Sequence, residues 1–100
     1  MANKRGLIFS PADNVASMLE EVLPGDTVRV QFGEESLSVT AEERIPFGFK
    51  MAVKEIMPEA PIVKYGQSIG RANQSIKQGA LVHIHNLAGI RGRGDLEKKL

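Results

Sequence analysis

The sequence predicts a mostly β domain of short strands and turns, with one short helix near residues 13–22. Two observations predict the strands: several runs alternate apolar and polar side chains, and glycine, proline, asparagine or aspartate interrupts each run within a few residues. Asp13 or Asn14 would be the N-cap of the helix. The helix itself is predicted from apolar side chains at helical spacing, namely Val15, Met18, Leu19 and Val22.

The other elements follow in order along the chain. Residues 7–9 predict a first short strand, and the Pro-Gly-Asp turn at residues 24–26 ends the helix. Residues 27–32 and 36–40 alternate on either side of a Gly-Glu-Glu turn, which predicts a β-hairpin. From Ile45 onward turn residues recur every few positions, so the strands must be short and the sheet irregular, bent or barrel-like.

The second half of the chain contains a weak internal sequence similarity. Residues 53–58 and residues 73–79 each place an isoleucine before a turn and another extended piece.

The composition excludes several function classes. A chain of 100 residues with 42% hydrophobic and 25% charged content fits one soluble globular domain. A net charge of +1 gives no basis for nucleic-acid binding, and the absence of cysteine removes disulfides and thiolate metal sites. No run approaches the roughly 18 apolar residues of a membrane span, and the apolar run near the N-terminus is too short for a secretory signal. We therefore expect a cytoplasmic protein that binds neither nucleic acid nor membranes.

The only two histidines, His83 and His85, lie two residues apart in an apolar run. In a strand both imidazoles would share one face. They are then either half-buried strand residues or a pair presented for metal ligation or proton transfer. A metal would need a third ligand from Asp13, Asp26, Asp95, a glutamate or another chain. Because such a small domain has little room for a cleft, functional histidines would share their cleft with a partner.

A basic, glycine-spaced segment follows at residues 91–95, Arg-Gly-Arg-Gly-Asp. It is either a solvated linker or a pair of guanidinium groups that bind an acidic ligand or an acidic subunit surface. Residues 97–100 predict a charged C-terminal tail.

Four segments in fixed order carry a more specific signal: PADNVA at 11–16, IPFGFKMA at 45–52, IVKYGQSIGRA at 62–72, and VHIHNL at 82–87 followed by RGRGDL at 91–96. Together they resemble the N-terminal domain of the altronate and galactarate dehydratase family. The same kind of domain occurs as a separate small subunit, as in the related sulfolactate sulfo-lyase. The resemblance implies a single SAF-type β-clip domain over residues 1–96.

The resemblance also implies a function. The chain would be the small subunit of a sugar-acid dehydratase, which helps a large catalytic subunit eliminate water from a hydroxy acid. A divalent metal, typically iron(II), would act in the complex and stabilise the developing enediolate charge, with none expected in the isolated domain. His83 and His85 would be the catalytic acid–base groups, with His85 also a candidate metal ligand.

Four further residues would bind substrate or secure the site in this resemblance. Lys50 would face the carboxylate of the acid, and Asn86 would orient the histidines or bind a substrate hydroxyl. Arg91 and Arg93 would chiefly secure the junction with the large subunit.

Two positions depart from the family pattern. The family usually reads Ile-Pro-x-Gly-His-Lys, but Phe49 stands at the histidine position, and Ser10 stands where many members have another histidine. Phenylalanine neither ligates a metal nor moves a proton, so the chain would use another substrate, take the group from its partner, or be non-catalytic. The alternatives to an enzyme subunit are a sugar-acid-binding or regulatory module and a structural adaptor. Exposed sheet edges are also compatible with a homodimer.

Overall fold

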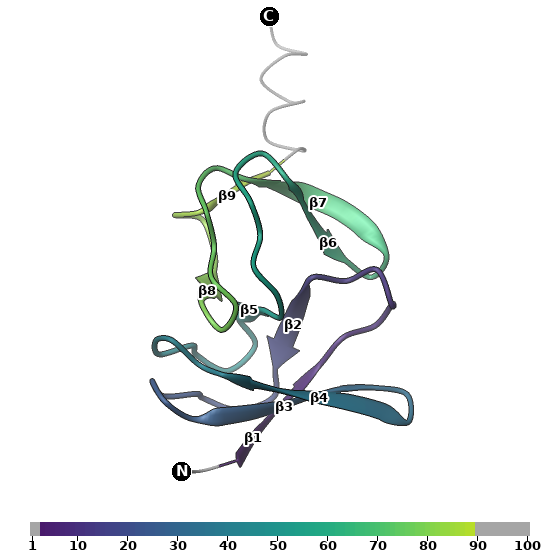
Figure 1. Cartoon of the computed structure of the whole chain (residues 1–100), viewed down its shortest axis with the longest axis vertical. Coiled ribbons are helices and arrows are strands. Elements are labelled where there is room, and N and C mark those ends of the chain that lie inside the picture. The colour runs from purple at the N-terminus through teal and green to yellow at the C-terminus, as the bar shows by residue number, and fades with distance from the viewer. Residues whose placement is uncertain (1–2, 90–100) are drawn as a thin grey trace, which may run out of the picture.

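The computed structural model describes residues 3–89, which contain nine strands and no helix. The strands form a six-stranded sheet, in the order β4-β3-β1-β2-β5-β8, and a three-stranded sheet, in the order β6-β7-β9 (Figure 1). Within this range no helix could cross a membrane. The strands are β1 (Asn3–Leu7), β2 (Val15–Met18), β3 (Thr27–Phe32), β4 (Glu35–Thr40), β5 (Lys50–Ala52), β6 (Pro61–Lys64), β7 (Gln67–Ala72), β8 (Leu81–Val82) and β9 (Leu87–Gly89).

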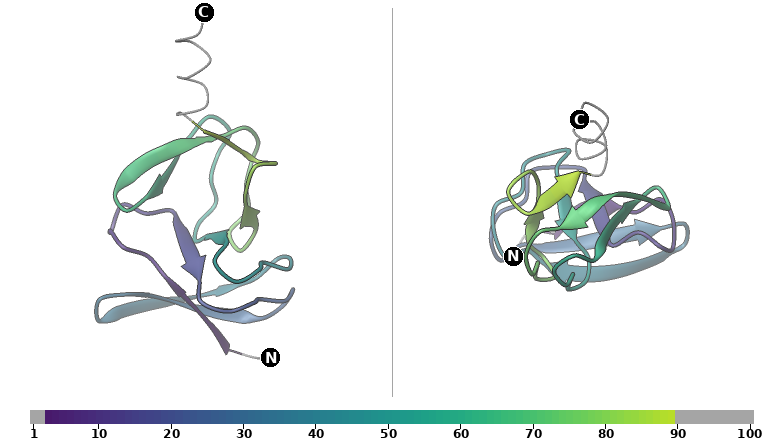
Figure 2. Two further views of the ribbon diagram at one scale, coloured as in Figure 1. Left: turned by 180° about the vertical axis from the view of Figure 1, so that it is seen from behind. Right: turned by 90° about the horizontal axis from the view of Figure 1, so that it is seen from above.

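The mostly β prediction and the predicted hairpin are confirmed. Strands β3 and β4 pair antiparallel from Thr27 opposite Thr40 to Phe32 opposite Glu35. β1 pairs parallel with β3 and antiparallel with β2, while the predicted first strand at residues 7–9 begins and ends earlier in the chain. The small sheet lies at the opposite end of the domain from the β3–β4 hairpin, as the views from behind and above show (Figure 2).

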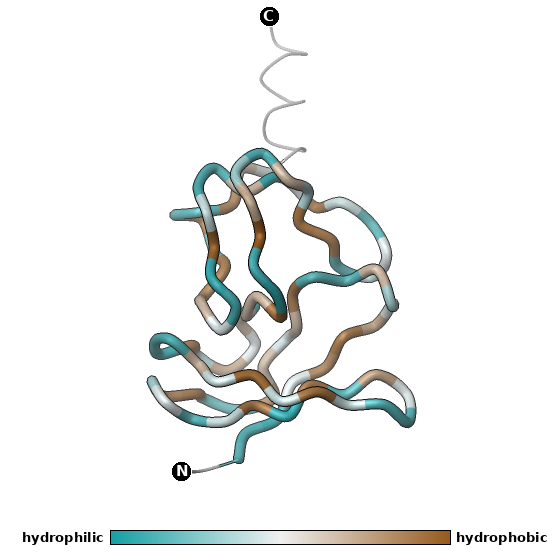
Figure 3. The backbone as a smooth tube through the Cα atoms, in the orientation of Figure 1, coloured by the Kyte–Doolittle hydropathy of each residue, from teal (hydrophilic) through white to brown (hydrophobic). Residues whose placement is uncertain are grey.

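Two apolar clusters stabilise the domain, and β2 and β5 contribute to both. Ala16 and Met18 belong to the cluster under the large sheet, whereas Val15 belongs to the cluster beside the small sheet. On β5, Met51 belongs to the cluster under the large sheet and Ala52 to the cluster beside the small sheet. Successive strand residues point to opposite faces, so two short strands are sufficient to join the clusters. Along the chain the hydrophobic stretches are short and are interrupted by hydrophilic ones (Figure 3).

The predicted helix at residues 13–22 is wrong, because residues 15–18 form strand β2. β2 lies between β1 and β5 and is covered on both faces, so it needs apolar residues at consecutive positions. A short buried strand of this kind cannot be distinguished from a helix by its apolar spacing alone. Asp13 and Asn14, expected as caps, bind backbone groups elsewhere in the domain.

One turn recurs four times and connects much of the chain. Each copy begins at a buried bridge residue and reaches a positive φ three residues later. In every copy the N–H four residues after the bridge residue donates to the carbonyl one residue after it, at 3.0–3.1 Å. The bridge residues are Val22, Ile45, Ile56 and Ile76, and the positive-φ residues are Gly25, Gly48, Glu59 and Gly79.

Backbone hydrogen bonds join the four turns into two pairs. Val22 and Ile45 exchange two backbone hydrogen bonds, and Ile56 and Ile76 exchange two more at 2.8 Å. The weak sequence similarity between residues 53–58 and 73–79 therefore corresponds to the second pair of turns, which Ile56 and Ile76 join. The first pair and the last turn border the segments that carry the candidate site residues.

Candidate functional site

The two histidines lie in a turn, which corrects the expectation of a strand with both imidazoles on one face. Strand β8 ends at Val82, and the backbone N–H groups of Asn86 and Leu87 both donate to the carbonyl of His83, at 3.1 and 2.9 Å. The chain therefore reverses over residues 83–86. Leu87 then begins β9 in the small sheet.

Asn86 is the reason for this reversal. Its side chain is 5% exposed, and its amide nitrogen donates to the carbonyl of Leu81 at 2.8 Å while its amide oxygen accepts from the N–H of His83 at 2.9 Å. A buried amide satisfied by local backbone in this way favours a turn over a continuing strand. Asn86 thus positions the backbone that carries both histidines.

His83 is half-buried and stacks on Phe49. The ring centroids lie 4.6 Å apart at an interplanar angle of 40°. Lys50 pairs with Val82 across β5 and β8, so Phe49 and His83 stand opposite each other at the next position of the same ladder. Phe49 also packs against the apolar cluster under the large sheet.

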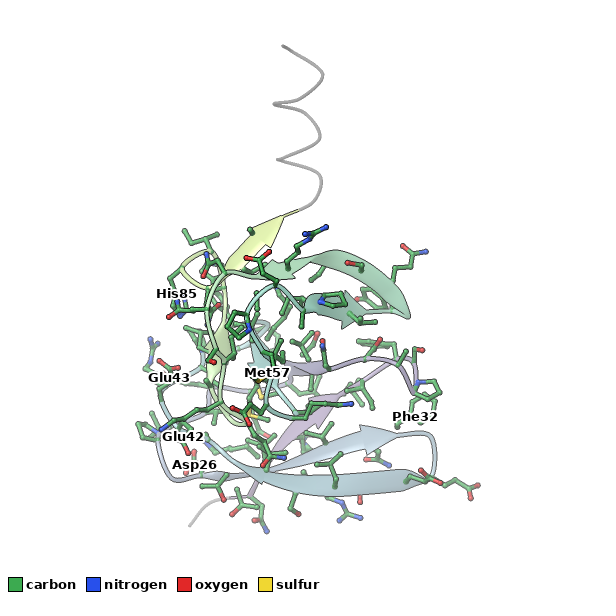
Figure 4. All side chains as sticks on the ribbon, turned by 45° about the horizontal axis from the view of Figure 1, so that its top comes forward. Asp26, Phe32, Glu42, Glu43, Met57 and His85 are labelled. Atoms are coloured by element: carbon green, nitrogen blue, oxygen red, sulfur yellow. The ribbon has the colours of Figure 1, made fainter. Side chains whose placement is uncertain are left out.

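His85 is exposed and lines a groove of about 430 Å³. Glu42, Glu43 and Lys77 also line this groove, so acidic and basic groups face the same space. Gln74 donates to the carbonyl of His85 at 3.2 Å, and the carboxylate of Glu43 accepts from the N–H of Leu81 at 2.9 Å. His85, Glu43 and Glu42 lie along one side of the molecule (Figure 4). The groove is therefore open and polar, with the imidazole of His85 at its wall.

The part of the chain that the structure describes supplies no metal site of its own. Among residues 3–89 no three histidine, aspartate or glutamate side chains gather closely enough to hold a metal ion. Asp13 and Asp26, two of the ligands considered for the histidines, bind backbone N–H groups instead. The described residues do not fit a resident iron(II) centre. Asp95 lies outside the described residues.

Lys50 lies on the opposite side of β5 from Phe49. Burial lowers the pKa of the Lys50 ammonium, and the charge of Lys64 lowers this pKa further. Both effects arise because the charged form loses water and faces a like charge. Lys50 and the His83 ring therefore do not converge on one point in this chain.

Lys64 is a residue that the sequence interpretation takes simply as part of a strand. It ends strand β6 as a half-buried side chain, and its ammonium lies 4.7 Å from the ring centroid of Tyr65. The signal in the sequence was weak, because Lys-Tyr-Gly reads as an ordinary strand end before a turn.

Asp13 and Asn14 hold the segment that carries Lys64. Asp13, 3% exposed, accepts from the N–H groups of Phe9, Ser10 and Gly66 at 2.8–3.1 Å. Asn14 donates from its side chain to the carbonyl of Pro61 at 2.9 Å and accepts from the N–H of Val63 at 2.8 Å. These two adjacent residues therefore fix both ends of the Pro61–Lys64 strand.

Arg91, Arg93 and the tail at residues 97–100 lie outside the described residues. Of the predicted site residues, Asn86 and the two histidines lie together in one turn of the backbone. Lys50 lies on another face of the domain.

Comparison with known proteins now identifies the domain. A family model described as the altronate/galactarate dehydratase SAF domain matches residues 4–89. The chain belongs to this family. The family and the SAF-type fold expected from the sequence are thereby confirmed.

Three relatives of this SAF domain are informative. The (2R)-sulfolactate sulfo-lyase subunit alpha of Chromohalobacter salexigens is 37% identical over 54 residues, which cover 54% of this chain and 57% of the relative. The altronate dehydratases of Bacillus subtilis and Escherichia coli are 34% and 36% identical over 74 residues, or 74% of this chain. These residues cover 14% of each altronate dehydratase, so the SAF domain spans only a small part of those enzymes.

Proposed function

We propose that this SAF domain is the small subunit of a lyase that eliminates water from a sugar acid or a related hydroxy acid. The observation that carries the proposal is an exposed histidine, His85, at the wall of an open polar groove in a domain of the altronate/galactarate dehydratase family. One relative is named as a subunit, and in two others the matched region is a small part of a longer chain. A larger polypeptide would therefore complete the site.

The elimination requires an acid, a base and a cationic group. A base removes the proton from the carbon next to the carboxylate, the electron pair left there forms the C=C bond, and the β-hydroxyl leaves as water after taking a proton from an acid. His85 has the exposure needed for one of these proton transfers. His83, half-buried against Phe49, is the second acid–base candidate, and Asn86 keeps both imidazoles on a fixed turn. Lys50 lies on another face, so it would bind a carboxylate of the acid that is remote from the carbon at which the histidines act.

Two exposed apolar side chains support a partner at this edge of the domain. Phe47 is 69% exposed in the turn before Phe49, and Ile84 is 81% exposed beside His83. The stacked rings of Phe49 and His83 hold these two turns next to each other. Large apolar side chains in such positions favour protein–protein contact over solvent. The large subunit would cover them, with Arg91 and Arg93 helping to secure the junction.

Any divalent metal would be held mainly by the large subunit. This chain would contribute His85 at most, because its described residues hold no three-ligand cluster. When bound, such a metal would stabilise negative charge on the substrate oxygens.

Reconstitution tests the proposal. The chain is co-expressed with the large subunit, supplied with iron(II), and assayed for dehydration of altronate and galactarate. The complex should turn over one of these acids while the isolated chain does not. His85→Ala should lower turnover by about 10²–10⁴-fold, in the range that general acid–base catalysis contributes.

The control is Lys54→Ala, an exposed lysine away from the groove, which should leave turnover unchanged. Co-purification must show that the His85→Ala chain still assembles with the large subunit. Full activity of this assembled variant would remove His85 from the chemistry.

Phe49 favours a second candidate, a sugar-acid-binding or regulatory module. An apolar ring occupies the position where the family resemblance places a histidine, which removes one proton-transfer group beside His83. Calorimetry on the isolated chain should then show sugar-acid binding, and the reconstituted complex should show no turnover that depends on His83 or His85.

A further inference from the structure

Two half-buried lysines, Lys50 and Lys64, have no acidic partner in residues 3–89. Four other basic side chains there form salt bridges, namely Lys4 with Asp26, Arg5 with Glu20, Arg44 with Glu21 and Arg71 with Glu59. Burial lowers the pKa of the Lys50 ammonium, and neither lysine gains an ion pair in return, so their placement needs a reason.

Strand pairing brings these lysines into one region. Lys50 on β5 pairs with Ser17 on β2, and the other end of β2 is bound to β6 through hydrogen bonds between Asn14 and Val63. β2 is thus the common neighbour of the two strands that carry the lysines.

The strands next to both lysines also contribute to the same apolar cluster. Lys50 shares its side of the ladder with its partner Val82, and Lys64 ends β6, the strand that contains Ile62. Val82 and Ile62 both belong to the cluster beside the small sheet. The charge of Lys64 lowers the pKa of Lys50, which agrees with this placement.

Hydrogen bonds hold the backbone on both sides of Lys64. Asn14 binds Pro61 and Val63, while Asp13 binds Gly66 just after the lysine. The ring of Tyr65 lies under the Lys64 ammonium and packs on the ring of Phe9 with centroids 4.6 Å apart. These contacts restrict the lysine before a ligand arrives, which lowers the entropy cost of binding.

We propose that Lys50 and Lys64 together bind one carboxylate group of an organic hydroxy acid, with Asp13 and Asn14 as the positioning residues. The proposal deepens the proposed function by assigning Lys64 as a second carboxylate-binding residue, and it rests on that function for the nature of the acid. The two carboxylate oxygens accept hydrogen bonds from two ammonium groups, and their charge relieves the repulsion between the lysines. Binding therefore also raises the pKa of Lys50 toward its ordinary value.

Titration of the full chain with galactarate, followed by NMR of the lysine side-chain Cε–H groups, tests the site. Galactarate should shift the Lys50 and Lys64 signals with saturation and raise the pKa of Lys50. Lys64→Met and Lys50→Met should each weaken galactarate binding about tenfold or more, because each removes one charge-assisted hydrogen bond. Lys64→Arg should retain most of the affinity, since the charge is kept.

Lys54→Met is the matched control, because Lys54 is exposed and lies outside both clusters. Galactitol, the uncharged polyol, tests whether the carboxylate is required. The site is refuted if galactarate does not bind, if galactitol binds equally well, or if Lys54→Met weakens binding as much as Lys64→Met in chains with intact amide spectra. A binding site without turnover in the reconstituted complex would instead contradict the proposed function alone.

Discussion

Phe49 stacks on His83 across the ends of β5 and β8, with their ring centroids 4.6 Å apart. The family resemblance implies a histidine at position 49, where it would stand beside His83. In this chain one imidazole is replaced by an apolar ring that packs into the cluster under the large sheet. Phe49 therefore adds apolar packing at the edge of the candidate site, where a histidine would add a second polar ring beside His83.

Phe49→His should create a zinc-binding pair. The new imidazole would stand beside His83 as a second zinc ligand, and water would complete the coordination, so binding is weaker than at a site with three protein ligands. We expect zinc to raise the free energy of unfolding of this variant by about 2.7 kcal/mol at a free concentration 100 times Kd, as measured by urea denaturation with and without zinc. The wild-type chain and the Phe49→His, His83→Ala double variant should show no such effect. An equal zinc response in the double variant would show that position 83 is not a ligand.

Asn86→Ala should destabilise the domain by about 2 kcal/mol. The change leaves the carbonyl of Leu81 and the N–H of His83 without their amide partner, and part of that cost is offset by water at the turn. Asn73→Ala, at an exposed asparagine, is the control and should change the free energy of unfolding by less than about 0.5 kcal/mol. Similar values for the two variants would mean that Asn86 does not hold the turn.

Asp13 should make the stability of the domain depend on pH in the acidic range. Burial raises the pKa of Asp13, but hydrogen bonds from the backbone of Gly66, Phe9, Tyr65 and Ser10 outweigh it, so the net pKa lies below the ordinary 3.8. A lowered pKa means that the carboxylate stabilises the fold above its unfolded-state value, and that this contribution is lost as pH falls through the folded-state value.

The Asp13→Asn variant isolates this contribution. The difference in free energy of unfolding between wild type and variant should be largest near neutral pH and should shrink below about pH 4. Glu55→Gln, at an exposed carboxylate, should show no comparable trend. A difference that stays constant down to about pH 2 would contradict the role assigned to the ionised form.

Glu59→Gly should stabilise the domain. Glu59 has a φ of 71° at the position where the other three copies of the recurring turn have glycine. A side chain in this conformation costs about 1 kcal/mol, while its 3.8 Å contact with Arg71 is exposed and contributes little. Thermal and urea unfolding should both show a gain of about 0.5–1 kcal/mol.

The reverse change checks the same idea. Gly25 has a φ of 87°, and a Cβ added there would meet open space, so Gly25→Ala tests the backbone cost without a clash. It should lower the free energy of unfolding by about 1 kcal/mol. A neutral Gly25→Ala together with a destabilising Glu59→Gly would contradict the interpretation of the turn.

Local patterns allowed part of this structure to be predicted. The β3–β4 hairpin was predictable because its alternation and its turn at Gly33 lie in one short segment. Strand β2 was not, because burial on two faces depends on distant partners. The turn at residues 83–86 was missed for a related reason: the hydrogen bonds of Asn86 decide it, and an asparagine after an apolar run gives no unique signal.

The residues of the candidate site were likewise only partly predictable from the sequence. Lys50 and the histidines could be singled out by the family resemblance, whereas the relation between Lys50 and Lys64 arises from strand order. Asp13 and Asn14 were recognised as polar residues with a structural role, but their partners are about 50 residues away in the chain, at Gly66 and Val63.

The recurring turn has a consequence for how this scaffold tolerates change. Its four copies share the same backbone hydrogen bond, while the residue after the bridge residue differs, from Leu23 and Met57 in two copies to Lys77 in another. Exchanging only these exposed residues between copies would therefore change the rim of the domain and leave the buried bridge residues in place, but Gly79 must stay glycine because a Cβ there would meet the backbone carbonyl of Thr40.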